Sequence, residues 1–203
     1  MPSAAPRQCS NNRREQILDA AARLFVEKGF SATSTRDIAR VSGMLPGSLY
    51  YHFSSKEDLL VAVYEEGVGR IGKSVDEAVA QAEAEPWARL ERACAAHLGM
   101  LLGGSDYAHV IARVQPGDVP GAEQSLVALR NRYELRFAHL VEALPLAPDV
   151  DRSVFRLMLI GAMNQAPVWF RPGRDTPPAL ARKFVANLRD PVAVPCNQTG
   201  ERP

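Results

Sequence analysis

Apolar residues along this 203-residue chain recur at the spacing of helices rather than of strands. Ile17, Ala21 and Leu24 share one face of a helix that we expect to begin at about residue 13. Later apolar residues step by three and four over residues 87–101 and 126–144. Because no segment alternates polar and apolar residues over the length of a strand, the pattern predicts an all-α fold of about nine helices.

The segment 151–170 differs from the other helical segments because it is apolar around nearly its whole circumference. A helix that is apolar all round has to be covered on more than one side, either in a core or at an interface between subunits. A Pro-Gly pair at 172–173 ends this segment, and an amphipathic helix over about 177–188 follows it.

Two short helices joined by a tight turn are predicted near the N-terminus. The first covers about 35–41, with Ser34 or Thr35 as its N-cap and Asp37 in the first turn, where the helix dipole favours a negative charge. A Ser-Gly pair ends it. The second covers about 46–52 and opens on a proline, which a first helical turn tolerates. Two short helices joined in this way can place the second one in the major groove of DNA.

A small apolar core should fix the angle between these two helices, and an alanine within it lets them approach closely. Aromatic residues close the second helix, and their polar tips can donate hydrogen bonds to phosphates. The expected members of the core are Ile38, Ala39, Val41, Leu49 and Phe53.

The string GSLYYHFSSKEDLL at 47–60, with TRDIA at 35–39 ahead of it, closely resembles the signature of the TetR family of helix-turn-helix regulators. The resemblance covers about residues 13–60. It implies an N-terminal three-helix helix-turn-helix DNA-binding domain and a C-terminal helical domain that binds an effector and dimerises. The expected boundaries are a disordered arm at 1–12, the DNA-binding domain at 13–60 with a linker helix to about 72, the effector and dimerisation domain at 73–190, and a disordered tail at 191–203.

The resemblance also implies that base contacts come from the first turn of the second short helix, with phosphate contacts around it. The proline at position 46 departs from many family members, because it removes a donor and adds only apolar surface. Direct readout would then rest on Ser48, on Arg36 and on apolar contacts with thymine methyls. Lys56 offers a charge and a helix N-terminus to the same backbone. The expected DNA-binding residues are Thr35, Arg36, Leu45, Pro46, Gly47, Ser48, Tyr50, Tyr51, His52 and Lys56.

The charge distribution gives modest support to a nucleic-acid partner. The formal net charge of the whole chain is only +1. Residues 1–56 hold eight Lys and Arg against four Asp and Glu, a net charge of +4, which leaves −3 for the rest of the chain. A basic N-terminal block attracts phosphates.

By resemblance, the larger domain senses a small ligand, and such sites have apolar walls with few polar groups. Asn164 and Gln165 interrupt a strongly apolar segment, and a buried amide needs a partner from a ligand, the backbone or a second subunit. The string WFRPG at 169–173 resembles a TetR-type branch linked to lipid and steroid catabolism, some of whose members respond to CoA thioesters. There Arg171 would pair with a phosphate or carboxylate while Trp169 stacks on the ligand. The expected ligand-binding residues, for each of which core packing is the alternative, are Trp87, His97, Met100, Tyr107, Tyr133, Phe137, Asn164, Gln165, Trp169 and Arg171.

The function implied by this resemblance is that of a repressor. A homodimer, joined through its last two helices, would bind a palindromic operator with its recognition helices roughly 34–36 Å apart. A small-molecule effector, either an apolar ligand or an acyl-CoA thioester, would release it. An activator, a dual regulator or a chromosome-organising factor is the alternative that the same DNA-binding head allows.

Other classes of protein fit the sequence less well. Ser105, Asp106 and His109 suggest a small helical hydrolase, but their spacing within one short helix or turn does not orient a triad, and no nucleophile elbow is present. We therefore expect no enzyme. The three cysteines, Cys9, Cys94 and Cys196, match no zinc or disulfide pattern and indicate unpaired thiols in a reducing compartment.

The remaining features concern location and cofactors. No apolar run approaches the roughly 18 residues of a membrane span, and the first dozen residues lack the apolar core of a signal peptide. The histidines lack the spacing of metal ligands. We expect a bacterial cytoplasmic protein, associated with the nucleoid when it is bound to its operator, that needs neither a metal nor a cofactor.

Overall fold

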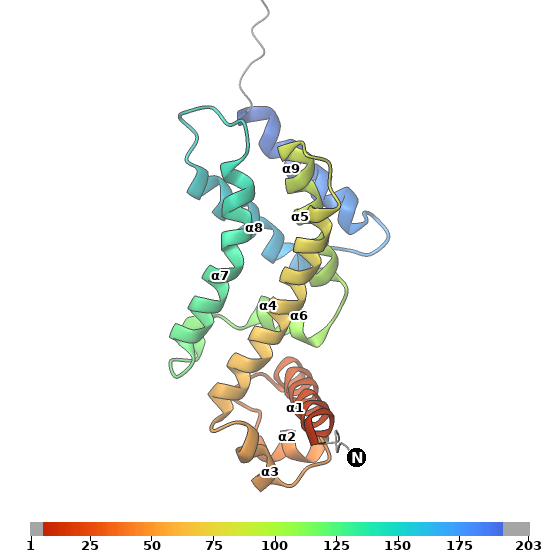
Figure 1. The fold of residues 1–203 in the computed structure, drawn as a ribbon, viewed down its shortest axis with the longest axis vertical. Coiled ribbons are helices and arrows are strands. Elements are labelled where there is room, and N and C mark those ends of the chain that lie inside the picture. Colours follow the sequence, from red (N-terminus) through yellow and green to blue (C-terminus); the bar gives the residue numbers. More distant parts are fainter. Residues whose placement is uncertain (1–5, 193–203) are drawn as a thin grey trace, which may run out of the picture. The chain divides into compact units, whose positions relative to one another are not determined.

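A computed structural model describes the backbone of residues 6–192 and the side chains of residues 12–189. Within that range the chain forms nine α-helices and one 3-10 helix, with no strand, which confirms the predicted all-α class (Figure 1). The helices are α1 (Pro6–Lys28), α2 (Thr35–Val41), α3 (Pro46–His52), α4 (Lys56–Ala80), α5 (Pro86–Leu102), α6 (Asp106–Arg113), η1 (Pro116–Asp118), α7 (Glu123–Glu142), α8 (Arg152–Trp169) and α9 (Pro177–Val192).

The chain divides into two compact units. The first unit contains the residues up to Lys73 together with Met100–Tyr133, so it joins α1, α2 and α3 with α6. The second unit contains Ser74–Gly99 together with the residues from Glu134 on, and therefore holds α8 and α9. The first unit thus includes segments beyond the predicted DNA-binding domain, because α6 packs against α1.

The first and last helices are longer than the sequence pattern suggested. Helix α1 begins at Pro6, within the segment expected as a disordered arm, and α9 continues to Val192 rather than ending near 188. Proline is accepted at a helix start, and the residues after it include no glycine that would weaken the helix. Residues 1–5 of the expected arm and residues 193–203 of the expected tail lie outside the described residues.

Helix α6 is an element that the sequence analysis treated only as a short helix or turn. Ser105 caps it, because its hydroxyl accepts a hydrogen bond from the backbone N–H of Ala108 at 3.2 Å. Tyr107 and Val110 are buried along one side. A helix of only eight residues gives too short a periodic pattern to be recognised with confidence from sequence.

Local signals account for the shape of the predicted helix-turn-helix. The Ser34 hydroxyl accepts a hydrogen bond from the backbone N–H of Asp37 at 3.1 Å, which identifies Ser34 as the N-cap of α2. At the other end Gly43 has φ 68°, and the backbone N–H of Met44 donates to the carbonyl of Ala39 at 2.8 Å. The backbone N–H of Gly43 also donates to the carbonyl of Arg40 at 3.2 Å. The two hydrogen bonds together form a Schellman motif, which reverses the chain within two residues and leads into α3.

Four of the five expected core residues of the helix-turn-helix are buried: Ile38, Ala39, Leu49 and Phe53. The prediction for Val41 is wrong, since its exposed fraction is 46%. Consecutive residues of a helix are about 100° apart around its axis. Val41, two residues after the buried Ala39, therefore points to the opposite side of the helix.

We expect Gly43→Ala to lower the free energy of unfolding by about 1 kcal/mol, because a Cβ disfavours the positive φ of this turn. No neighbouring atom lies within 4 Å of the added Cβ, so the effect comes from the backbone alone. Urea unfolding measures it. Gly47→Ala is the matched control, since Gly47 has no positive φ and equally open surroundings. Equal stability of Gly43→Ala and wild type would contradict this account of the turn.

Helix α8 is buried on one side only within the single chain. Phe155, Leu159 and Met163 lie on the buried side. The opposite side carries Val154 and Met158, with exposed fractions of 50% and 58%. Of the two explanations for its all-round apolar character, full burial in the core of one chain is therefore wrong.

Candidate nucleic-acid interface

The outer face of α3 exposes side chains that a folded protein usually covers. Tyr51 is 88% exposed and Leu45 is 76% exposed, while Leu49 between them is fully buried. Leu49 and Phe53 pack α3 against the rest of the helix-turn-helix, and the outward residues remain available to a partner. Exposed apolar and aromatic side chains grouped on one surface mark an interaction site.

A hydrogen bond links the two helices of the motif at this surface. The hydroxyl oxygens of Thr35, at the start of α2, and Tyr50, near the end of α3, are 3.1 Å apart. Both residues were expected at the DNA interface, and the structure brings them together. The same surface exposes Arg36 and the first turn of α3, made of Pro46, Gly47 and Ser48, and it includes the half-buried His52.

Lys56 has a different set of partners from the ones that the sequence suggested. Its ammonium donates to the carbonyl oxygens of Phe30 at 2.8 Å and Thr33 at 3.0 Å, and it lies 4.3 Å above the centre of the Phe30 ring. These groups belong to the loop between α1 and α2. The charge of Lys56 therefore stabilises the loop that leads into α2.

The expected ligand-binding residues are distributed over both compact units. Met100, Tyr107 and Tyr133 belong to the first unit, while Trp87, His97, Phe137, Asn164, Gln165, Trp169 and Arg171 belong to the second. Five of the ten side chains are buried, namely Trp87, His97, Tyr107, Tyr133 and Phe137. Met100 is half-buried, and Asn164, Gln165, Trp169 and Arg171 are exposed.

Tyr107 links α6 to α1 inside the first unit. Its hydroxyl donates to the Asp19 carboxylate at 2.7 Å, and the Arg70 guanidinium lies 4.3 Å from the centre of its ring. Burial and the Asp19 carboxylate together raise the pKa of Tyr107. Gly67 of α4 faces the same helix, because a Cβ there would lie 2.7 Å from Ile111. Sequence patterns do not indicate this contact, since Asp19 and Tyr107 are 88 residues apart.

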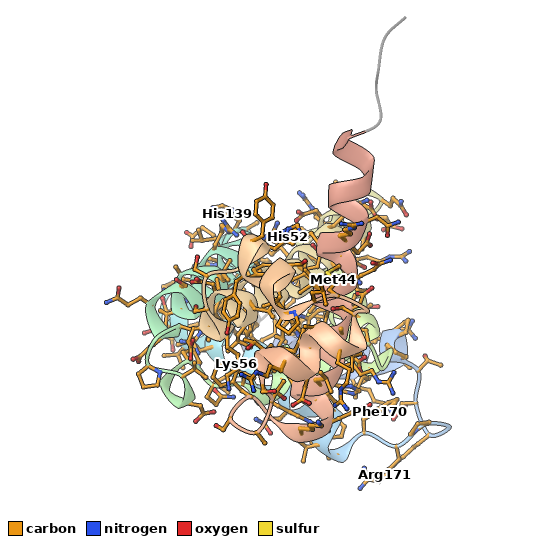
Figure 2. All side chains as sticks on the ribbon, turned by 90° about the horizontal axis from the view of Figure 1, so that it is seen from below. Met44, His52, Lys56, His139, Phe170 and Arg171 are labelled. Carbon is orange, nitrogen blue, oxygen red and sulfur yellow. The ribbon has the colours of Figure 1, made fainter. Side chains whose placement is uncertain are left out.

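In the second unit the buried candidates form aromatic contacts. The Trp87 ring lies 6.3 Å from Phe155, and the His97 ring lies 5.8 Å from Phe137, both edge to face. At the end of α8, Trp169 packs against Phe184 with ring centres 6.1 Å apart. The Arg171 guanidinium donates to the carbonyl of Phe170 at 3.0 Å, and the side chain projects outward (Figure 2).

His97 makes the stability of the second unit sensitive to acid. Burial lowers its pKa to about 4, although a hydrogen bond with the Asn164 side chain acts in the opposite direction. The pKa of the unfolded residue is near 6.5. Between these values the unfolded chain binds a proton that the native chain does not, so stability present above pH 6.5 is lost as the pH falls toward 4.

We therefore expect the free energy of unfolding to fall by about 2 kcal/mol between pH 7 and pH 5 through His97 alone. Urea titrations at both pH values measure this difference. In His97→Gln the same pH change should have an effect smaller by about that amount. His139→Gln, which alters an exposed histidine, should behave like wild type. Equal pH dependence of wild type and His97→Gln would contradict the prediction.

Two other kinds of site are absent from the part of the chain that the structure describes. In residues 6–192 no helix is both long and apolar enough to cross a bilayer. Over the same part of the chain, no group of three or more His, Cys, Asp or Glu side chains is placed to hold a metal ion. Ser105, considered above for a triad, uses its hydroxyl oxygen to cap α6.

A helix-turn-helix with an outward aromatic face, on an otherwise helical chain, has the architecture of a DNA-binding transcription regulator. Residues 17–63 match the family described as bacterial regulatory proteins, tetR family. Residues 83–192 match the tetracyclin repressor-like C-terminal domain, over more than half of the chain. The protein belongs to the TetR family of helix-turn-helix transcription regulators.

One relative resembles the chain over nearly its whole length, and another resembles a short segment of it at higher identity. It is 27% identical to the HTH-type transcriptional repressor KstR2 of Rhodococcus jostii over 208 residues, which is 97% of this chain and 98% of the relative. KstR2 of Mycobacterium tuberculosis is 52% identical over 50 residues, 25% of each chain. The crystal structure of AibR in complex with isovaleryl coenzyme A and operator DNA superposes on this chain with a TM-score of 0.74 at 26% sequence identity. The superposition covers 86% of this chain and 97% of AibR.

Proposed function

We propose that this protein is a transcriptional repressor that binds a palindromic operator as a homodimer and leaves it when a small effector binds. The observation that carries the proposal is the outer face of α3, where Leu45, Tyr50 and Tyr51 are exposed on a helix anchored by a fully buried leucine. Such a helix can enter the major groove while α2 crosses the phosphate backbone. The repressor role of the relative from Rhodococcus jostii supports the same direction of control.

The exposed face of α8 supports the homodimer. Val154, Leu157, Met158 and Val168 are each at least half exposed. Leu157, Met158 and Val168 follow Val154 by three, four and fourteen residues, which places all four along one side of the helix. The side also contains Gly161 and Gln165 and no charged residue. A second copy of α8 is the occupant we propose, because a neutral apolar stripe is self-complementary about a twofold axis.

An acyl-CoA thioester is the effector class that we propose. AibR, which has the same fold and is 26% identical, was crystallised with isovaleryl coenzyme A and operator DNA together. In this chain Trp169 and Arg171 are both exposed at the end of α8, where a ring and a guanidinium can receive an adenine and a phosphate. Binding would favour a conformation of the dimer whose DNA-binding heads no longer match the operator.

Fluorescence anisotropy with the DNA upstream of the protein's own coding region tests the proposal. The purified protein is titrated into this DNA and into a random duplex of equal length, over a salt series. We expect selective binding with a steep salt dependence, because the interface neutralises phosphates. Isovaleryl, longer acyl and steroid CoA thioesters are then added to the complex, with free coenzyme A as control.

Each outcome has a defined meaning for the proposal. Release by a thioester but not by coenzyme A supports both parts of it. Selective binding without release by any thioester would contradict the effector class alone. If the protein binds the upstream DNA no better than the random duplex, and genome-wide selection of binding sites also yields no preferred sequence, the operator-binding function itself is wrong.

A further inference from the structure

A polar notch lies beside the helix-turn-helix, within the first unit. It has a volume of ≈ 230 Å³ and is lined by residues from three segments. The first half of α1 contributes Arg13 and Gln16, α3 contributes Ser48 and His52, and the turn contributes Ser42, Gly43, Met44 and Leu45. Figure 2, which views the molecule from this end, shows Met44 and His52 on the part of the head that the beginning of α1 passes.

The chemistry of the notch suits an anion. Its side chains supply a guanidinium, an amide, a hydroxyl and an imidazole, all of which can donate hydrogen bonds. No carboxylate lines it. The Ser42 hydroxyl is already engaged, because it donates to the carbonyl of Ile38 at 2.9 Å. The remaining donors, on Arg13, Gln16, Ser48 and His52, face one space from two helices.

Arg13 differs from the other arginines at the exposed side of α1. Arg23 pairs with Glu27 at 2.8 Å, and Arg14 lies over the Phe53 ring at 5.6 Å. Among the described residues, Arg13 has neither an ion pair nor an aromatic ring as a partner. An exposed guanidinium beside a cavity without acids is positioned to receive a phosphate, which it can bind through two parallel hydrogen bonds.

We propose that the notch binds one phosphate group of the operator backbone, held by Arg13 of α1 together with Ser48 and His52 of α3. The proposal rests on the proposed operator binding and adds α1 to the DNA interface. Leu45, the N-cap of α3, and Ser48 in its first turn both line the notch, so a phosphate held there lies next to the bases that this turn can read. The contact would fix how deeply α3 enters the groove.

The test compares the salt dependence of operator binding for wild type and Arg13→Ala. One lost phosphate contact per half-site should reduce the slope of log K against log salt by about 0.9, or about 1.8 for the dimer. We expect affinity to fall by about tenfold per half-site at physiological salt. The fall should be similar for operator and random duplexes, because a phosphate carries no sequence information.

Two variants control for other effects of the substitution. Arg23→Ala removes an exposed arginine from the same helix that is already paired with Glu27, and it should leave the slope unchanged. Arg13→Lys keeps the charge and should restore most of the slope, but less of the affinity, since it loses the bidentate geometry. Circular dichroism should show the same helix content in all variants, because both arginines are exposed.

Inorganic phosphate separates a backbone phosphate from a free one. If phosphate binds wild type but not Arg13→Ala in calorimetry, while the DNA slope is the same for both, the notch binds free phosphate and the DNA contact is wrong. An unchanged slope without phosphate binding also overturns the proposal. In both cases selective operator binding by wild type would leave the proposed function intact. Loss of selective binding by wild type itself would instead overturn that function.

Discussion

Replacing Met158 with arginine is expected to convert the proposed homodimer into folded monomers and to lower operator affinity by about 100-fold or more. Met158 is 58% exposed in the single chain, on the neutral apolar side of α8. In a twofold interface the substitution buries two arginines, one from each copy, without acidic partners on that side of the helix. The loss of dimerisation then removes the advantage of binding two half-sites at once.

Sedimentation velocity and operator anisotropy measure the two effects of Met158→Arg. Leu135→Arg is the matched control, because Leu135 is an apolar residue of α7 with a similar exposed fraction of 55% that lies outside the α8 stripe. It should leave both the dimer and the operator affinity unchanged. A Met158→Arg protein that remains dimeric would contradict the assignment of this face to the second copy.

Replacing Lys56 with methionine is expected to lower the free energy of unfolding by about 3 kcal/mol and operator affinity by at least about tenfold. Methionine keeps the aliphatic stem but removes the ammonium that donates to the carbonyls of Phe30 and Thr33. Hydrogen bonds to a charged group contribute about 1.5–3 kcal/mol each, and one of the two carbonyls can be rehydrated. The loop that positions α2 would then lose its main support.

Urea unfolding and operator anisotropy together identify the role of Lys56. Lys28→Met is the control, because Lys28 belongs to the same head but makes only an exposed ion pair with Asp37 at 3.8 Å. If Lys56→Met is as stable as wild type and only reduces the salt slope, then Lys56 acts as a phosphate contact and the structural role is wrong. A large loss of stability supports the clamp on the α1–α2 loop.

The sequence by itself determined the helical class and the limits of the two short helices of the DNA-binding head. The N-cap of α2 and the Ser-Gly turn that ends it each depend on residues within one helical turn, which is the range over which sequence signals act, although the choice of Ser34 over Thr35 came from the structure. The family signature then indicated which face of α3 points outward. The helix limits follow from local chain chemistry, whereas the outward face of α3 was implied by the resemblance to the family.

Tertiary structure alone decided how segments far apart in the chain use their side chains. Lys56 binds carbonyls 23 and 26 residues earlier, Tyr107 binds Asp19 across 88 residues, and Arg13 faces the same notch as α3. It also decided that Val41 is exposed and that α8 is buried on only one side of a single chain. Helical periodicity gives the face on which a residue lies, but only the packing angle between helices determines what that face meets.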